Sequence, residues 1–166
     1  TSKTINIQVG NSATSSNNHL EVLKKLLPYK DKNICIYLPL SYGSQEYAKK
    51  IIEQGREWFG DKFKPLTDML PFNEYLAFLG TIDIAIFNHN RQQAMGNTIT
   101  LLGLGKTVYI RSDTTQWQFF KGKGIKIRDV EQLNTLESQN INENMRIIKT
   151  YFSQDNYLKQ LESLFN

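Results

Sequence analysis

The segment Ile82-Asp-Ile-Ala-Ile-Phe87 is almost entirely apolar, so a strand formed by it would be buried on both of its faces. It lacks the length and the period of a helix. Strands of this kind are typical of a parallel sheet that is covered by helices on each side. The segment therefore predicts one strand of such a sheet.

Extended and helical patterns alternate on both sides of this segment. Further strands are predicted at residues 4–9, 33–38, 63–66 and 107–110, with a weaker signal at 125–127. Helices are predicted from the leucines that precede Pro28, after Ser44, after Pro71, and at residues 97–104, 142–151 and 156–165. This alternation predicts an α/β fold, an open parallel sheet with helices on both faces. Ligands of such sheets bind beyond the carboxyl ends of the strands.

Length and composition fit one globular domain. The chain has 166 residues, of which 40% are hydrophobic and 22% are charged. No apolar run approaches the roughly 20 residues of a membrane-spanning helix, and the polar start carries no secretion signal. The single cysteine, Cys35, excludes an intrachain disulfide and a cysteine metal cluster. We expect a soluble, intracellular domain, and the start without methionine suggests excision from a longer protein.

The charge is mildly positive. A net charge of +4 is small for a duplex-binding domain, and the basic residues are not interleaved with exposed aromatic residues, so nucleic acid is not expected as a partner. The densest basic stretch is Lys121-Gly-Lys-Gly-Ile-Lys-Ile-Arg128, with four cations and no acid. It is either a solvated loop that runs into an exposed strand or a basic rim that faces anionic lipid or a phosphorylated substrate.

A polar loop follows the first predicted strand and reads Gly10-Asn-Ser-Ala-Thr-Ser-Ser-Asn-Asn18. Gly10 would let a ligand approach the backbone, while Asn11 and Ser12 offer uncharged donors. Backbone amides at a strand-to-helix turn can bind a phosphate. The alternative is an ordinary flexible turn in which Asn17 or Asn18 caps the next helix.

A second polar loop follows Phe87 and reads Asn88-His-Asn-Arg-Gln-Gln-Ala-Met-Gly-Asn-Thr98. A helix that starts there would present free amide donors and a partial positive charge, and Arg91 could grip phosphate oxygens with two hydrogen bonds. The alternatives are that Asn97 only caps the helix and that Arg91 is an ordinary surface residue. Two donor-rich loops at one end of a parallel sheet favour a diphosphate site.

Other chemical motifs are weak or missing. The second and third glycines of a dinucleotide fingerprint are absent, and Leu102-Gly-Leu-Gly-Lys-Thr107 resembles a P-loop but follows a helix and enters a strand, which is the reverse order. Only two histidines are present, His19 and His89, far apart in sequence. His89 is either a base or phosphate donor in the second loop or a structural residue. No metal-ligand spacing and no catalytic pair is visible, so the catalytic residues are unknown.

Six short motifs occur in a characteristic order. They are Val9-Gly-Asn-Ser12, Asn18-His19, Pro39-Leu-Ser-Tyr-Gly43, Phe72-Asn-Glu-Tyr-Leu76, Arg91-Gln-Gln93 and Gly96-Asn-Thr98. Together they resemble the carboxyl half of the TDP-N-acetylfucosamine:lipid II N-acetylfucosaminyltransferases, the 4-alpha-L-fucosyltransferase family. The similarity extends over residues 5–161.

The resemblance implies a B-type glycosyltransferase, in which two Rossmann-like domains enclose the active site. Residues 1–166 would be the C-terminal, donor-binding domain, without the N-terminal domain that holds the acceptor and the catalytic base, so this fragment alone is expected to be inactive. The implied donor-binding residues are Gly10, Asn11, Ser12, Leu66, Thr67, Asp68, Arg91, Gln92, Gln93, Gly96, Asn97 and Thr98, with residues 66–69 facing the base. No metal or other cofactor is implied, because helix dipoles and basic side chains neutralise the leaving diphosphate.

The resemblance also implies a reaction and a place. N-acetylfucosamine would pass from a TDP-sugar to an undecaprenyl-diphosphate-linked glycan, lipid II, in the synthesis of enterobacterial common antigen or a related surface polysaccharide. The enzyme would be peripheral, at the cytoplasmic face of the bacterial inner membrane. The rival hypothesis is a non-catalytic, flavodoxin-like module that binds a nucleotide-sugar or phosphate and needs no second domain.

Overall fold

Six parallel strands form one sheet with the order β3-β2-β1-β4-β5-β6. The computed structural model describes residues 3–91 and 93–151. The strands are β1 (Ile5–Val9), β2 (Ile34–Pro39), β3 (Phe63–Leu66), β4 (Ile84–Phe87), β5 (Thr107–Ile110) and β6 (Arg128–Asp129). All neighbouring pairs are parallel, and β1 pairs with both β2 and β4. The parallel sheet expected from the sequence is confirmed.

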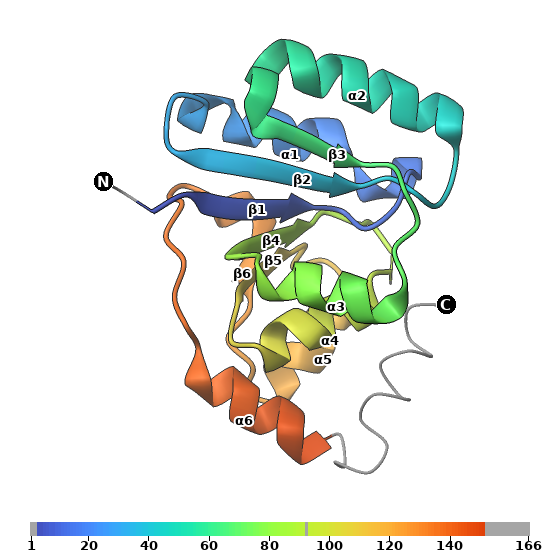
Figure 1. Cartoon of the computed structure of the whole chain (residues 1–166). Helices are drawn as coiled ribbons and strands as arrows, with labels where there is room; N and C mark the ends of the chain where they lie inside the picture. Colours follow the sequence, from blue (N-terminus) through green and yellow to red (C-terminus); the bar gives the residue numbers. More distant parts are fainter. Residues whose placement is uncertain (1–2, 92, 152–166) are drawn as a thin grey trace.

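Helices cover both faces of this sheet (Figure 1). They are α1 (His19–Leu26), α2 (Gln45–Phe59), α3 (Phe72–Gly80), α4 (Met95–Gly103), α5 (Thr115–Gly122) and α6 (Asn142–Tyr151). Short 3-10 helices occupy Ser15–Asn17, Leu27–Tyr29, Gly60–Lys62 and Val130–Gln132. Helices α1 and α2 lie on one face, and α3 to α6 lie on the other.

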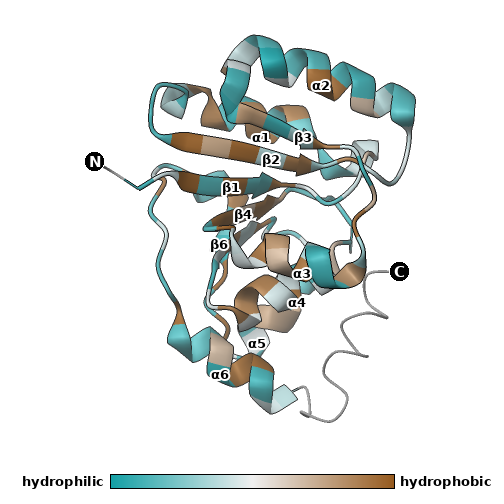
Figure 2. Cartoon of the chain, in the orientation of Figure 1, coloured by the Kyte–Doolittle hydropathy of each residue, from teal (hydrophilic) through white to brown (hydrophobic). Residues whose placement is uncertain are grey.

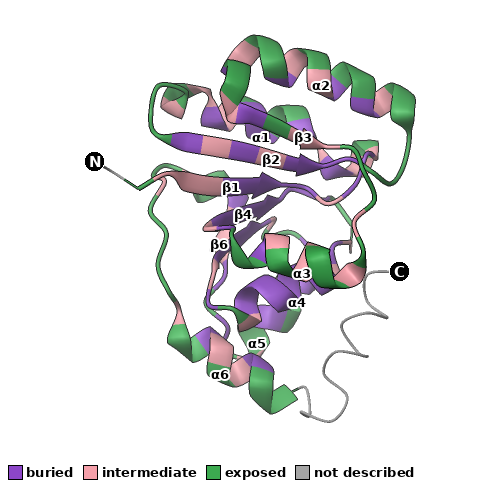
Figure 3. Ribbon diagram, viewed as in Figure 1, coloured by how far each residue is buried: buried purple, intermediate pink, exposed green. Residues whose placement is uncertain are grey.

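Two apolar cores lie on opposite faces of the sheet. Ile84 and Ile86 of β4 contribute to the core beneath α1 and α2, whereas Ala85 and Phe87 contribute to the core beneath α3 to α6. All residues of β4 are buried (Figure 3). The hydropathy colouring shows apolar strands between helices with polar outer surfaces (Figure 2). The strand is apolar throughout because helices cover both of its faces, as predicted.

The last strand is not at residues 125–127, where the sequence predicts it, but at Arg128–Asp129. Ile125 and Ile127 are buried in the second core without belonging to the sheet. The backbone groups of Lys126 are already bonded, because its N–H donates to Asn144 Oδ1 at 2.8 Å and its carbonyl accepts from Asn144 Nδ2 at 2.9 Å. The alternating isoleucines therefore reflect burial, not strand pairing.

Helix α5 is not predicted by the sequence, because only Gln116 and Phe120 of this helix are buried and no apolar period marks it. Trp117 lies in its first turn, where the backbone N–H donates to the Thr114 hydroxyl at 3.2 Å. Helix α4 begins at Met95, before the predicted start at Asn97. The helix predicted at 156–165 lies outside the described residues.

Helix α2 packs closely on β3 at Gly55. A Cβ at this position would overlap the ring of Phe63. We expect Gly55→Ala to lower the free energy of unfolding by about 1–3 kcal/mol through overpacking, although alanine is the better helix former by about 1 kcal/mol. Urea denaturation measures the change. Gly80→Ala is the matched control, since a Cβ there meets nothing within 4 Å, and equal stability of both variants would contradict the close packing.

Candidate functional site

The strand order reverses between β1 and β4. From β1 the chain continues through β2 to β3 on one side, and from β4 it continues through β5 to β6 on the other. Ligands of open parallel sheets bind at such a reversal, beyond the carboxyl ends of the strands. The loops after β1 (residues 10–18) and β4 (residues 88–94) border this position, and we call the region between them the crevice. The Gly10 N–H donates to the Ile86 carbonyl at 3.0 Å, so the first loop starts against β4.

The β1 loop is organised by the buried side chain of Asn17. Its Oδ1 accepts hydrogen bonds from the N–H groups of Asn11 and Ser12, at 2.9 and 3.4 Å. Its Nδ2 donates to the hydroxyl of Ser12 at 3.0 Å and to that of Thr14 at 2.8 Å. Two amides that the sequence suggests as phosphate donors are thus bonded within the loop. The loop is closed by its own hydrogen bonds, and the binding of a phosphate by its amides stays a prediction.

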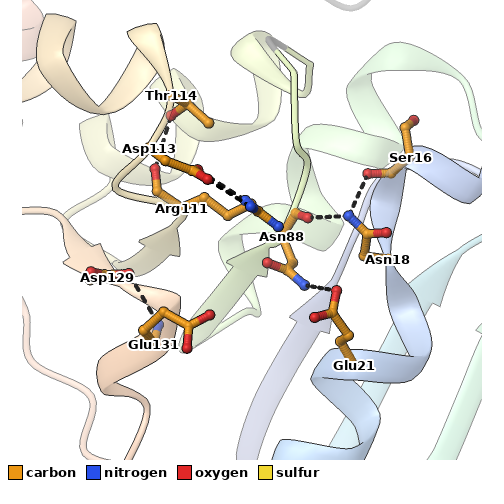
Figure 4. A network of polar contacts seen from close by, with 9 residues as sticks. All are labelled: Ser16, Asn18, Glu21, Asn88, Arg111, Asp113, Thr114, Asp129 and Glu131. Atoms are coloured by element: carbon orange, nitrogen blue, oxygen red, sulfur yellow. Dashed lines mark hydrogen bonds and ion pairs between the residues drawn. The ribbon is translucent and has the colours of Figure 1, made fainter.

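The helix that follows is not capped by an asparagine side chain. Asn18 occupies the N-cap position of α1 with φ of 51°, but neither it nor another side chain makes the cap hydrogen bond. Its Nδ2 donates instead to the Asn88 carbonyl at 2.9 Å (Figure 4). The alternative in which Asn17 or Asn18 caps the helix is therefore wrong, since the side chains of both residues bond to the loops.

Side chains join the β1 loop directly to the β4 loop. His89 Nε2 donates to Asn11 Oδ1 at 3.0 Å, and the Ser16 hydroxyl donates to Gln93 Oε1 at 2.5 Å. A line of hydroxyl groups leads to the second contact, because those of Ser12 and Thr14 lie 3.0 Å apart and those of Thr14 and Ser16 lie 3.1 Å apart. The structure thus brings together the predicted residues Asn11, Ser12 and Gln93.

The first turn of α4 contributes mainly backbone to the crevice. Gly96, Asn97 and Thr98 are all buried. Asn97 does not cap the helix. Its Oδ1 accepts from the Tyr75 hydroxyl at 2.5 Å and from Gln8 Nε2 at 3.3 Å, so it ties α4 to α3 and β1. The side chains of Asn97 and Thr98 therefore face the protein interior, and the first N–H groups of the helix have no partner within it, as at any helix N-terminus.

Arg91 lies on the β4 loop and is exposed. Its charge contributes to the lowered pKa of the neighbouring His89. The binding of phosphate oxygens by the Arg91 guanidinium stays a prediction. Gln92, the next predicted residue, lies outside the described residues.

Both histidines are buried beside the crevice. Burial, followed by the charge that a protonated His89 carries, lowers the pKa of His19 to about 3. Burial, followed by the charge of Arg91, lowers the pKa of His89 to about 4. The Nδ1 atom of His19 lies 2.9 Å from the Tyr47 hydroxyl. Both rings are neutral near pH 7, and the hydrogen bond from His89 to Asn11 favours the structural interpretation of His89.

Leu66, Thr67 and Asp68 lie apart from the other predicted residues. Leu66 ends β3, the edge strand, and the two residues that follow it, Thr67 and Asp68, are exposed. Thr67 lines a groove of about 510 Å³ together with Leu40 and the first turns of α2. The loop after β2 connects this groove to the crevice, because the Ala13 N–H donates to the Tyr42 carbonyl at 2.6 Å. The predicted base-facing segment thus borders the same edge of the sheet.

The loop after β5 lies at the same edge of the sheet, and the sequence prediction names no site residue in it. Arg111 donates from Nε and Nη2 to the Asp113 carboxylate at 3.0 and 2.7 Å (Figure 4). Asn88 of the neighbouring loop donates to Glu21 at 3.2 Å, so charged groups continue along this edge of the crevice. The signal is the position of Arg111 directly after Ile110, at the end of a predicted strand.

Neither a metal site nor a membrane-spanning helix is found among the described residues. Within residues 3–91 and 93–151, no group of three or more His, Cys, Asp or Glu side chains is placed to hold a metal ion. In the same part of the chain, every helix is too short or too polar to cross a membrane.

Solved structures with low sequence identity share this fold. The C-terminal domain of a glycosyl transferase group 1 family protein from Francisella tularensis matches with a TM-score of 0.64 and 11% identity, over 96% of this chain and 84% of that chain. The catalytic domain of cholesterol-alpha-glucosyltransferase from Helicobacter pylori matches with a TM-score of 0.56 and 18% identity, over 96% and 98%. An alpha,alpha-trehalose-phosphate synthase (UDP-forming) from Burkholderia vietnamiensis matches with a TM-score of 0.62 and 10% identity, over 96% and 39%.

The fold is that of the C-terminal, Rossmann-like domains of B-type glycosyltransferases, and the protein is a glycosyltransferase domain. The particular family follows from the sequence. The family described as 4-alpha-L-fucosyltransferase, glycosyl transferase group 56, matches residues 1–164. The chain belongs to this family, which confirms the resemblance found from the order of its motifs.

Proposed function

We propose that the crevice between the β1 and β4 loops binds the diphosphate of a nucleotide-sugar donor. The observation that carries the proposal is the meeting of these two polar loops where the strand order reverses, joined by the contacts of His89 with Asn11 and Ser16 with Gln93. Membership of a sugar-transferring family supports a donor of this class. Crevices at such reversals are the usual ligand sites of open parallel sheets.

The role of this domain would be to bind the donor and to stabilise the leaving diphosphate. The N-terminus of α4 carries a partial positive charge and unpaired amides, which favour an anion. Arg91 would add a full charge and two parallel donors. Neutral His89 would keep Asn11 in place through its hydrogen bond, and residues 66–68 would border the nucleotide base at the groove beside α2.

The finer assignment follows the family. The donor would be a TDP-linked N-acetylfucosamine, and the acceptor would be an undecaprenyl-diphosphate-linked glycan that is held by a second domain. Enterobacterial common antigen or a related polysaccharide would be the product. The mild positive charge of +4 is compatible with anionic donor and acceptor groups.

Calorimetric titration of this domain with TDP, UDP and ADP tests the proposal. We expect binding that does not require magnesium and that is tightest for TDP. Binding of all three with equal affinity would keep the diphosphate site and contradict the TDP assignment. Absence of binding in a folded protein would contradict a self-sufficient donor site in this domain.

Arg91→Ala should weaken TDP binding by about 1–3 kcal/mol, because a charge-assisted contact with the diphosphate is lost. Calorimetry of the two proteins measures the difference. Arg56→Ala is the matched control, since Arg56 is exposed on α2 and faces away from the core. Equal affinities of Arg91→Ala and the unmodified domain would remove Arg91 from the site.

A further inference from the structure

A basic and aromatic surface extends over α5, the residues that follow it, and α6. We call it the α5–α6 surface and define it by Phe119, Lys121, Lys123, Lys126, Arg146, Lys149 and Tyr151. Phe119 is 47% exposed and Tyr151 is 54% exposed, and both are among the most exposed large hydrophobic residues of the described chain. This surface lies outside the crevice between the β1 and β4 loops and is not needed for the proposed diphosphate site.

Its aromatic and basic side chains touch one another. The Lys123 ammonium lies 4.6 Å from the centre of the Phe119 ring and 3.7 Å from that of the Tyr151 ring. Beneath them, an apolar pocket of about 200 Å³ is walled by isoleucine and phenylalanine side chains of α4, α5 and α6. A cation held over two exposed rings at the mouth of an apolar pocket is the central feature of this surface.

The charge of the α5–α6 surface is strongly one-sided. Five cations belong to it. One of these cations forms an ion pair: the Lys126 ammonium lies 3.2 Å from the Glu143 carboxylate. Within residues 3–91 and 93–151, one carboxylate therefore pairs with one of the five cations, and the other four have no ion pair there.

We propose that the α5–α6 surface binds an anionic phospholipid bilayer. Basic side chains near a negative membrane surface are attracted to it, and aromatic rings lie favourably at the boundary between head groups and acyl chains. The lysine stems contribute apolar contact while their ammonium groups reach the phosphates. The apolar pocket offers room to an acyl chain, for which a nucleic-acid backbone has no equivalent. The sequence predicts no exposed aromatic residues among the basic ones, and this expectation is wrong here, because Phe119 and Tyr151 are exposed beside the basic stretch that begins at Lys121.

Sedimentation with lipid vesicles tests this proposal on the complete 166-residue chain. We expect binding to vesicles that contain phosphatidylglycerol, little binding to phosphatidylcholine alone, and weaker binding as salt is added. The double variant Lys121→Glu with Lys149→Glu should lower the partition coefficient by about tenfold or more. Phe119→Ser should lower it as well, without a change of charge.

The control variant carries Lys50→Glu with Arg56→Glu, two exposed positions of α2 on the other face of the sheet. It changes the net charge equally and should keep the vesicle binding. The proposal is overturned by equal losses in both double variants, by equal binding to neutral vesicles, or by no vesicle binding at all. Two other results would also overturn it: a dimer that the Lys121→Glu and Lys149→Glu changes dissociate, or binding of single-stranded oligonucleotide in place of vesicles. Calorimetry with TDP is independent of all these outcomes.

Discussion

Gly10→Ala should lower the free energy of unfolding by about 2–5 kcal/mol and abolish nucleotide binding. Gly10 has φ of +69°, where an L-residue is disfavoured by about 1–2 kcal/mol. A Cβ would also lie 2.5 Å from Asn17 Oδ1 and 2.6 Å from His19 Nε2, and such overpacking typically costs a further 1–3 kcal/mol or so. Both neighbours are buried, so neither can move aside freely. Urea denaturation and calorimetry measure the two effects.

A second glycine separates the steric effect from the backbone effect. Gly124 has φ of +82°, but the atom nearest to a Cβ at this position would be Ile147 Cδ1 at 3.8 Å, an ordinary contact. Gly124→Ala should therefore show only the backbone penalty of about 1–2 kcal/mol. A loss of stability at Gly10 no greater than that at Gly124 would contradict the close contact with Asn17 and His19.

The stability of the domain should fall steeply as the pH drops from about 6.5 towards 4. In the unfolded chain, a histidine takes up a proton near its ordinary pKa of 6.5, whereas burial lowers the pKa of folded His19 to about 3 and that of folded His89 to about 4. Between these values the unfolded state binds more protons, so acid favours unfolding. Each histidine contributes a slope of up to about 1.4 kcal/mol per pH unit. Above pH 6.5 the contribution is complete and the curve should level off.

Urea denaturation at several pH values measures this slope. The glutamine of His89→Gln keeps a side-chain amide that can bond Asn11 but cannot titrate. Between pH 4 and 6.5, the free energy of unfolding of this variant should therefore change less steeply with pH, by the contribution of one proton, up to about 1.4 kcal/mol per pH unit. The difference between the two proteins removes the contribution of the carboxylates, which titrate in both. Identical slopes would show that His89 accepts a proton in the folded state as readily as in the unfolded one.

The sequence predicts those parts of the fold in which burial follows a simple period. Strands β3 and β5 and helix α6 have the predicted bounds, and the fully apolar β4 is buried on both faces as expected. The prediction fails where side chains replace regular pairing. Asn144 takes the backbone bonds that would have extended β6, and Thr114 starts α5 without an apolar stripe behind it.

The sequence predicts where the two candidate loops lie, but it does not predict the contacts that their side chains make. The loops after Val9 and Phe87 meet as expected because parallel strands end at one edge. Asn17, however, has no local signal, since its role depends on a turn that brings it back to Asn11. Asn97 bonds Gln8, which is 89 positions away in the sequence, and such contacts cannot be read from spacing alone.

The Asn17 side chain gives the β1 loop a thermodynamic advantage. Its amide oxygen accepts hydrogen bonds from the N–H groups of Asn11 and Ser12 and holds them in place without a bound anion. The loop is therefore preorganised before any donor arrives, and binding sacrifices little conformational entropy there. A donor that meets a rigid loop associates without waiting for a rearrangement, so a single-step association is the kinetic signature of this asparagine.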